Sequence, residues 1–271
     1  MSTRAPGRNI PARPASTPGP ARGGAMMSLL LSVALATPAR AVDHDAFQRV
    51  LSTYVDARSR VDYAGIHQAG ALDGYLADIA AAELPASRNE RIALWINAYN
   101  ALTIDLIADA WPVASIRDLD GGKVWDTRRF TVAGESLTLN DIEHRRLRPL
   151  TDGRIHAAVN CASLGCPPLP RTVFRGATLD SQLDAAAESW VASNAVAIDR
   201  DHNTVRFSRI FDWYAEDFAV EGDPDPPGLS GRKAEAANWV AAHADPDTAA
   251  FLRAGGYTAE WDRYDWSVNA Q

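Results

Sequence analysis

The chain has 271 residues, of which 46% are hydrophobic and 23% are charged, ordinary proportions for a soluble globular protein. It carries 27 Lys and Arg against 34 Asp and Glu, a net charge of −7 at pH 7. This acidic balance argues against nucleic acid and anionic membrane surfaces as partners. No apolar run reaches the roughly 18 residues that a membrane span needs, so we expect no span in the mature chain.

The first 41 residues differ in composition from the rest of the chain. They hold five arginines and no acidic residue, and an apolar run over residues 25–36 precedes the small-residue sequence Ala39-Arg40-Ala41. This order is typical of a secretory signal, so we expect export to the periplasm or the extracellular space. The alternative is an uncleaved tail. Five of the 27 basic residues lie in this leader, which leaves 22 against 34 acidic residues, a net charge of −12.

Three helices are predicted in the first third of the mature chain. Residues 43–55 and 72–82 place apolar side chains at helical spacing. Ser87, with Glu90 three residues later, has the pattern of a capping box and begins a helix that runs to about residue 110. That third helix is apolar nearly all round, which is typical of a buried helix.

Two asparagines interrupt the apolar surface of this third helix. Asn97 and Asn100 fall on one stripe of it. A buried amide left unpaired costs about 1–3 kcal/mol, so both side chains should have partners. They either clamp neighbouring loop backbone or line a substrate-binding site beside Cys161.

The second half of the chain mixes helices with short hairpins. Residues 124–132 and 135–139, on either side of a turn at Ala133-Gly134, predict a first hairpin, and Asn140 with Glu143 three residues later predicts a capped helix start. Ser208 can cap a short helix. The remaining predicted elements are a helix over 179–192, a hairpin of 196–198 with 204–207, and helices near 234–242 and 248–252. We therefore expect one α+β domain over 42–271, with several helices around a buried central one, short antiparallel hairpins and one inner strand.

The inner strand is predicted for residues 154–160, directly before the two cysteines. Ile155, Ala157 and Val159 alternate with polar or small residues, as in a half-buried strand. After Cys161, small residues, Gly165 and two prolines indicate a tight loop. The end of a rigid element followed by such a loop suits an exposed nucleophile.

Several sequence blocks resemble the family DUF547, named as a domain of unknown function. The blocks are Val61-Asp62-Tyr63, LWINAYNALT at 94–103, LTLNDIEH at 137–144 with Leu147-Arg148, RIHAAVNCASLGCP at 154–167, FDWY at 211–214 with Asp217-Phe218, and Tyr264-Asp265-Trp266. The resemblance covers nearly the whole mature chain in order. It implies one intact domain of a widespread bacterial family whose members are often exported, and it implies no particular reaction.

Cys161 and Cys166 allow four interpretations. They form a disulfide, which export permits; Cys161 is a nucleophile with a histidine as base; both bind zinc, for which the spacing is loose; or they are simply buried. The first two are compatible, because a disulfide can be the resting state of a nucleophile. We expect no cofactor and no metal.

The nucleophile hypothesis describes a thiol-dependent hydrolase or acyltransferase acting on an amide or thioester in a small molecule or peptide. Its rival is a non-catalytic binding or assembly module whose Cys161–Cys166 disulfide shapes a recognition loop. The site residues predicted besides Cys161 are His144 or His156 as base, Glu143 or Asn160 as the group that orients it, and Asn97, Asn100, Arg148 and Arg154 at the substrate.

Between the two histidines, the predicted strand favours His144. Four strand residues separate His156 from Asn160, about 13 Å, which places His156 far from Cys161 and suggests a structural role for it. The histidines at 44, 67, 202 and 243 are interpreted as surface residues. Asp212, Glu216 and Asp217 form either an acidic pair for proton transfer or a solvated helix face, and the solvated face is preferred.

Overall fold

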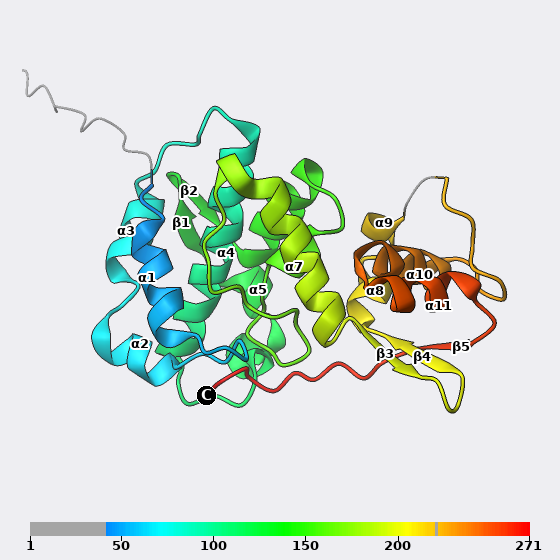
Figure 1. Ribbon diagram of the computed structural model, residues 1–271. Helices are drawn as coiled ribbons and strands as arrows, with labels where there is room; N and C mark the ends of the chain where they lie inside the picture. Colours follow the sequence, from blue (N-terminus) through cyan, green and yellow to red (C-terminus); the bar gives the residue numbers. More distant parts are fainter. Residues whose placement is uncertain (1–41, 220–221) are drawn as a thin grey trace, which may run out of the picture. The chain divides into compact units, whose positions relative to one another are not determined.

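The fold is arranged around α4, Arg88–Asp109, in a computed structural model that describes residues 42–219 and 222–271 (Figure 1). Every residue of this helix from Ile92 to Ile104 is buried, which confirms the predicted buried helix. Ser87 precedes it, but its side chain makes no capping hydrogen bond. The predicted leader lies outside the described residues, all of which belong to one compact unit.

Three short helices precede α4 in the sequence. They are α1 (Asp45–Tyr54), α2 (Tyr63–Ala69) and α3 (Asp73–Ala80), and both α2 and α3 pack directly on α4. The helices predicted over 43–55 and 72–82 are confirmed. Helix α2 was not predicted; Asp62 caps it by accepting a hydrogen bond from the Gly65 amide.

The segment after α4 contains the first hairpin and a π-helix. It holds η1 (Ile116–Gly122), α5 (Val124–Thr127), β1 (Phe130–Val132), β2 (Glu135–Leu137), η2 (Asp141–Leu147) and η3 (Arg148–Leu150). The hairpin turns at Ala133-Gly134 as predicted, although residues 124–127 are helical. Thr138 and Asp141 exchange capping hydrogen bonds, and Asn140 makes none. Glu143 is therefore not held in a capping box.

The inner strand predicted over 154–160 was wrong. Residues Ile155–Ala158 form a helical turn, α6, and the chain becomes extended only at Val159. All four residues of α6 are buried, so the alternation of polar and apolar residues did not reflect alternating burial. A short apolar run does not by itself distinguish strand from buried helix. The argument that His156 lies too far from Cys161 assumed an extended strand, so it no longer holds.

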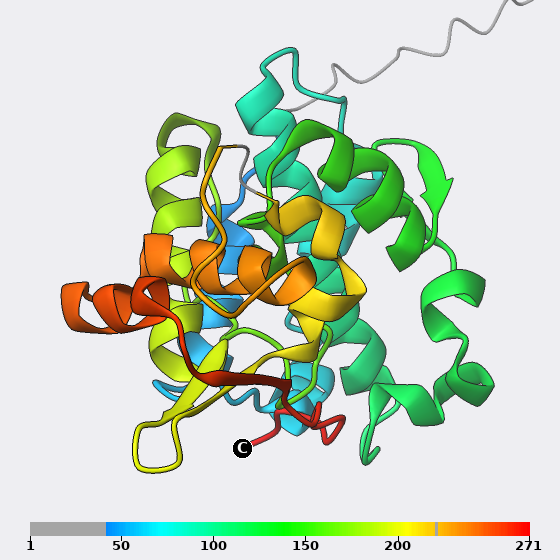
Figure 2. The same ribbon diagram turned by 90° about the vertical axis from the view of Figure 1, so that its right-hand side faces the viewer.

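The remainder of the chain forms a second group of helices with a three-stranded sheet (Figures 1 and 2). Strand β3 (Val196–Asp199) pairs antiparallel with β4 (Thr204–Phe207), which confirms the second hairpin, and β5 (Thr258–Trp261) joins β4 in parallel. Helices η4 (Gly176–Thr178) and α7 (Leu179–Ser193) pack on α4 and α6 of the first group. The helices of the second group are α8 (Arg209–Trp213), α9 (Ala215–Phe218), α10 (Arg232–His243) and α11 (Pro246–Ala254). Ser208 caps α8 as predicted. The α+β class is confirmed.

Aromatic packing fixes α8 and α9 against α7 and α10. The Trp190 and Phe211 rings stack with centroids 4.8 Å apart, and Phe218 and Trp239 close the cluster. All four side chains are buried. Because such pairs contribute about 0.5–1.5 kcal/mol each beyond their buried area, the segment 209–218 is firmly placed.

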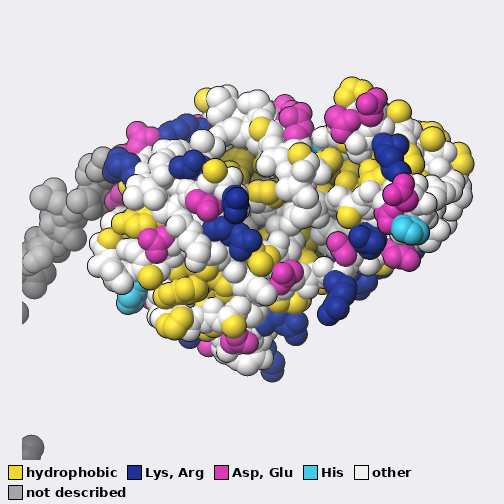
Figure 3. All heavy atoms as spheres, turned by 60° about the horizontal axis from the view of Figure 1, so that its bottom comes forward, with side chains coloured by type: hydrophobic (Ala, Val, Ile, Leu, Met, Phe, Trp, Pro, Cys, Tyr) yellow, Lys and Arg dark blue, Asp and Glu magenta, His cyan; other side chains and the backbone are white. Residues whose placement is uncertain are grey.

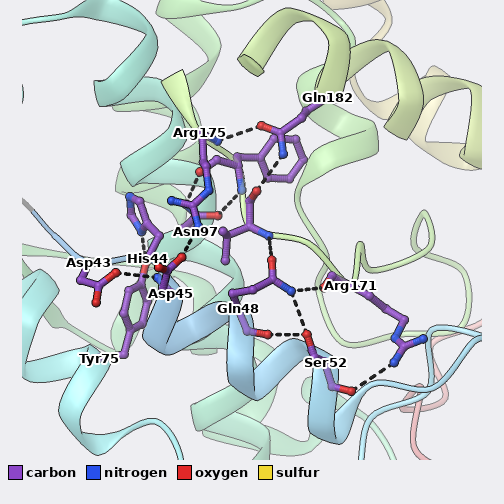
Figure 4. A network of polar contacts seen from close by, with 12 residues as sticks. Asp43, His44, Asp45, Gln48, Ser52, Tyr75, Asn97, Arg171, Arg175 and Gln182 are labelled. Atoms are coloured by element: carbon purple, nitrogen blue, oxygen red, sulfur yellow. Dashed lines mark hydrogen bonds and ion pairs between the residues drawn. The ribbon is translucent and has the colours of Figure 1, made fainter. Parts of the chain in front are cut away.

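Asn97 clamps a distant loop to α4. Its amide donates to the Phe174 carbonyl and its oxygen accepts from the Phe174 amide, at 2.8 and 2.9 Å (Figure 4). This is the backbone-clamp alternative, and it leaves the side chain unavailable to a substrate. In the same network, His44 donates to or accepts from the Tyr75 hydroxyl at 2.8 Å and is buried, so its interpretation as a surface histidine was wrong.

On the face drawn in Figure 3, basic and acidic side chains are interspersed. Many are paired, as Arg154 is with Asp152 and Asp184. In the ranges 42–219 and 222–271, no helix is both long and apolar enough to cross a membrane.

The central position of α4 predicts the effect of truncating Trp95. This side chain is 1% exposed. Trp95→Ala should lower the free energy of unfolding by about 3–5 kcal/mol, because a cavity replaces a large buried ring. Urea denaturation followed by circular dichroism measures this difference.

Trp213→Ala is the matched control, since it removes the same side chain from a position that is 45% exposed. Its loss should be well below that of Trp95→Ala, because less apolar area leaves water there on folding. Equal losses in the two variants would contradict the central role of α4.

Candidate functional site

A cavity of about 240 Å³ lies where α4, η2, α6 and α8 meet the cysteine loop and the C-terminal segment. It contains both cysteines, one histidine, two carboxylates and several aromatic rings. Its lining residues include Tyr99, Trp125, Asp126, Glu143, His156, Cys161, Cys166, Trp213, Tyr214, Tyr264 and Trp266. The sequence-predicted Cys161, Glu143 and His156 therefore come together in one place.

The cysteine loop is anchored to the central helix by Asn100. Its amide donates to the Ala158 carbonyl at 2.9 Å, and its oxygen accepts from the Asn160 amide at 2.9 Å. Asn160 in turn donates to the Pro167 carbonyl and accepts from the Ala162 amide, each at 2.8 Å. Both asparagines are buried and hold backbone, so they position Cys161 and do not face a substrate.

Cys161 and Cys166 lie at disulfide distance, with their Cα atoms 6.3 Å apart. Between them, Ala162 has φ of +60°, a left-handed conformation that is unfavourable for a residue with a side chain. The hydrogen bond from its amide to Asn160 maintains this conformation. The loop therefore has a single strained shape that surrounding contacts impose.

The C-terminal segment closes the other side of the loop. In Figures 1 and 2 it leaves β5 and runs back to the first half of the chain, where the Val61 amide donates to the Asn269 carbonyl. On its way the Gly165 amide donates to the Asp265 carbonyl at 2.8 Å. A Cβ at Gly165 would lie 2.9 Å from the Asp265 nitrogen, so this approach requires glycine.

This segment brings the Tyr264 hydroxyl to the two sulfurs. The hydroxyl lies 3.0 Å from Cys161 Sγ, 3.1 Å from Cys166 Sγ and 2.8 Å from Ser163 Oγ. Burial raises the pKa of Tyr264, so the phenol stays protonated at neutral pH and can donate a hydrogen bond. It is the polar group in direct contact with both sulfur atoms.

His156 is held by a charged pair on its far side. Its Nε2 lies 2.7 Å from Asp217 Oδ2, and Arg148 contacts both oxygens of Asp217, with Nε to Oδ2 at 2.6 Å. Burial alone would raise the pKa of Asp217, but the hydrogen bonds from His156 and Arg148 outweigh it and lower that pKa to about 2. Asp217 is therefore an anion, and His156 Nε2 carries the proton between them.

Asp212, Glu216 and Asp217 were interpreted as parts of a solvated helix face. Asp212 departs from this, because its side chain is 18% exposed and pairs with Arg209 and Arg232. That interpretation was wrong for Asp217, whose side chain is 19% exposed and pairs with His156 and Arg148. It holds for Glu216, which is 78% exposed and reaches only Arg148. Helix α9 has only 4 residues, too few for a periodic pattern that would predict which of these acidic side chains is exposed.

Glu143 lies inside the cavity wall between two tyrosines. It is 5% exposed, and its carboxylate lies close enough to Tyr99 and Tyr214 to act on the ionisation of both hydroxyls. Burial first, and then the charge of Glu143, raises the pKa of both tyrosines. The hydrogen-bond partners of the two candidate histidines are Arg148 for His144 and Asp217 for His156, so the orienting role expected for Glu143 belongs to Asp217 in the case of His156.

The other predicted site residues lie elsewhere. His144 Nδ1 is 3.0 Å from Arg148 Nη1, and its side chain lines a separate hollow with Asp126 and Arg145. Arg154 is held by Asp152, Asp180 and Asp184 at the N-terminal end of α7. The structure therefore brings His156, and not His144, to the cavity of Cys161.

Sequence reasoning missed most of the cavity's aromatic lining. The blocks at 211–214 and 264–266 contributed to the family resemblance, yet their tyrosines and tryptophans were not predicted as site residues. Their clustering was a usable signal, because Trp213, Tyr214, Tyr264 and Trp266 come from segments of mixed polar and aromatic residues and not from regular apolar stripes. Their meeting with Cys161 depends on long-range packing.

Residues 84–191 match the family model described as "Protein of unknown function, DUF547". That range contains α4, the π-helix, α6 and both cysteines. No curated protein and no solved structure matches the chain.

The pairing of Asp217 predicts a pH-dependent stability. Because its folded-state pKa of about 2 lies below the unfolded value, its ionised form adds stability that is present above about pH 4 and lost as pH falls through about 2. Asp217→Asn should destabilise the protein by about 1 kcal/mol near neutral pH, after allowance for solvent screening. Urea titrations at several pH values should show this difference shrinking in acid.

Glu216→Gln is the control, because it removes a charge from the same arginine at an exposed position. Its difference from the wild type should stay below about 0.5 kcal/mol throughout. A constant penalty for Asp217→Asn down to about pH 2 would contradict the ionised pair.

Proposed function

Residues 84–191 belong to the family DUF547, and we propose that the chain is an exported thiol-dependent hydrolase or acyltransferase that acts on an amide or thioester through Cys161. The observation that carries the proposal is the convergence of Cys161 with a histidine–aspartate pair in one cavity. A nucleophile, a base and a group that orients the base are the parts that thiol enzymes combine.

The disulfide is the resting form in this proposal. An external dithiol reduces it by exchange: one thiolate attacks a sulfur, the S–S bond breaks, and the second thiolate of the reductant completes its own disulfide. The products are two cysteine thiols and one oxidised reductant. Cys166 is buried and Cys161 is partly exposed, so Cys161 is the sulfur that a substrate in the cavity meets.

His156 is the base, because its contact with Asp217 fixes its tautomer. Asp217 accepts from Nε2–H, which leaves the lone pair on Nδ1. Within the ranges 42–219 and 222–271, Nδ1 of His156 has no hydrogen-bond partner. It takes the proton of the Cys161 thiol; the thiolate then forms a C–S bond with the substrate carbonyl carbon, and the leaving amine or thiol departs with that proton.

Water or an acceptor nucleophile completes the cycle by the reverse steps. It attacks the thioester carbonyl carbon, loses its proton to His156, and the C–S bond breaks to return Cys161. Tyr264 donates a hydrogen bond next to the reacting sulfur, where a negative charge forms and disappears. Water as acceptor gives a hydrolase, and an amine or alcohol gives an acyltransferase.

Export is part of the proposal because two features of the sequence support it. The leader has a basic region, an apolar run and a small-residue site. A disulfide as resting form also fits an oxidising compartment outside the cytoplasm.

The alternative function is a non-catalytic binding or assembly module. The disulfide distance between Cys161 and Cys166 favours it, because a permanent bridge removes the nucleophile. The bridge lies in the wall of a cavity, where it would shape the recognition surface directly. The two functions differ in whether a reduced Cys161 is unusually reactive.

Alkylation of Cys161 across pH separates them. In a Cys166→Ser variant the free Cys161 should react with iodoacetamide with a midpoint pH clearly below about 8.5, the ordinary thiol value, because an imidazolium nearby stabilises the thiolate. Adding His156→Ala should move the midpoint towards about 8.5. Mass spectrometry of the labelled peptide gives the rates.

His144→Ala in the same background is the matched control and should leave the midpoint in place, since His144 lines a different hollow. A shift with His144→Ala alone would return the base to the residue expected from sequence. An ordinary midpoint in all variants would leave only the binding module. Acetyl transfer from a thioester to Cys161, seen as an added mass, tests acylation directly.

A further inference from the structure

The cavity beside Cys161 is unusually rich in aromatic rings. Trp213 and Tyr264 have ring centroids 4.9 Å apart, Tyr264 and Trp266 4.4 Å, and Trp125 and Trp266 6.0 Å. These four residues, here called the aromatic wall, form one continuous group at the side of the cavity.

Trp213 of the aromatic wall leaves a large apolar surface in contact with water, which is energetically unfavourable. It is 45% exposed, and among the described residues only Leu84 is a comparably exposed large hydrophobic side chain. Trp213 is the last residue of helix α8, whose Ile210 and Phe211 are buried and already anchor the helix to the core. A tryptophan kept in water at the rim of a cavity is a characteristic binding group.

The charge of the cavity has one sign. Asp126 and Glu143 line it, and no lysine or arginine of the described ranges does. Asp126 accepts a hydrogen bond from Asn140, and Glu143 is 5% exposed beside Tyr99 and Tyr214 in the cavity wall. Aromatic faces carry partial negative charge, which adds to that of the carboxylates.

Two arginines already use aromatic faces near the cavity. Arg117 lies 5.0 Å from the centroid of Trp266 and Arg148 lies 5.4 Å from that of Tyr214. These contacts show that rings lining the cavity accept cations. They also reduce the ring surface that is left for a ligand. Within the aromatic wall, no such contact with an arginine of the described residues is made by Trp213, Trp125 or Tyr264.

We propose that the cavity binds a substituted ammonium group of the substrate, held by cation–π contacts with the aromatic wall and by the charge of Glu143. Cation–π contacts become stronger as water is excluded from them, and aromatic cages are a recurrent site for such cations. The cavity is small beside typical ligand pockets of about 300–1,000 Å³, so it takes the head of a ligand and not a large body. The proposal rests on the proposed function only in taking this cavity as the substrate site.

Two sources share this chemistry, namely a quaternary ammonium such as a choline head and the primary ammonium of a lysine side chain in a peptide. Both would present a cation on a flexible carbon chain, and an amide or ester bond near it would reach Cys161. The size of the cation separates the two, because a trimethylated head fills an aromatic cage more completely than a primary amine.

Binding is measured on the oxidised protein, in which Cys161 cannot react, so that the result is independent of the thiol chemistry. The probes are choline and Nα-acetyl-lysine methylamide, each with a neutral counterpart of the same shape: 3,3-dimethylbutan-1-ol and the Nα-acetyl methylamide of 2-aminoheptanoic acid. Tryptophan fluorescence and calorimetry give the dissociation constants. We expect at least one cation to bind at least tenfold more tightly than its counterpart, and the better cation identifies the source.

Two variants locate the binding. Trp213→Leu and Glu143→Gln should each weaken the cation about fivefold or more and leave the neutral counterpart nearly unchanged. Glu216→Gln removes an exposed carboxylate outside the cavity and should change neither. If Glu143→Gln does not fold, the affinities of each cation and its neutral counterpart for the native protein still test the proposal. Equal binding of each pair, or saturation by neither cation, overturns the proposal.

Discussion

The hydrogen bonds of Asn100 are the constraint on which the site depends. A helix as buried as α4 can hold an amide only if both ends of that amide are satisfied, since an unpaired one costs about 1–3 kcal/mol. The partners are the Ala158 carbonyl and the Asn160 amide. They lie on either side of the point where α6 ends and the chain extends towards Cys161. The most rigid element of the protein therefore fixes the position of the cysteine loop directly.

Other side-chain amides repeat this arrangement around the same loop. Asn160 spans Ala162 and Pro167 across the loop, Asn194 donates to the Cys166 carbonyl, and Asn97 holds the chain at Phe174. Each replaces a backbone partner that regular secondary structure would have supplied. The loop can therefore lack helix and strand and still have one conformation, including the left-handed Ala162. Rigid irregular backbone of this kind suits a site whose atoms must be positioned closely.

The sequence was sufficient where periodicity was long or a turn was local. It predicted α4, α1, α3, α7 and both hairpins, because those patterns depend on neighbouring residues. It failed at 154–160, where four consecutive buried residues carry no usable period. It also failed where two local explanations competed: Glu143 fitted a capping box, but Thr138 and Asp141 form the cap and leave Glu143 to the tyrosines. The contacts of Asp217 and Tyr264 with His156 and Cys161 join residues 61 and 103 positions apart, which no local pattern encodes.

The charges of the site also explain which groups remain for chemistry at Cys161. Arg148 and Arg154 were expected at the substrate, but carboxylates pair with both of them. With Glu143 nearby, the cavity itself is electronegative, and an anion on Cys161 needs compensation. His156, once protonated, and the Tyr264 hydroxyl are the groups of the described chain that can supply it. A bound ammonium group would add a positive charge at the same place, so occupancy of the aromatic wall and formation of the thiolate would favour each other by linkage. Without a cation, an electronegative cavity favours the uncharged forms of these two sulfurs, which are the disulfide and the protonated thiols, over the thiolate.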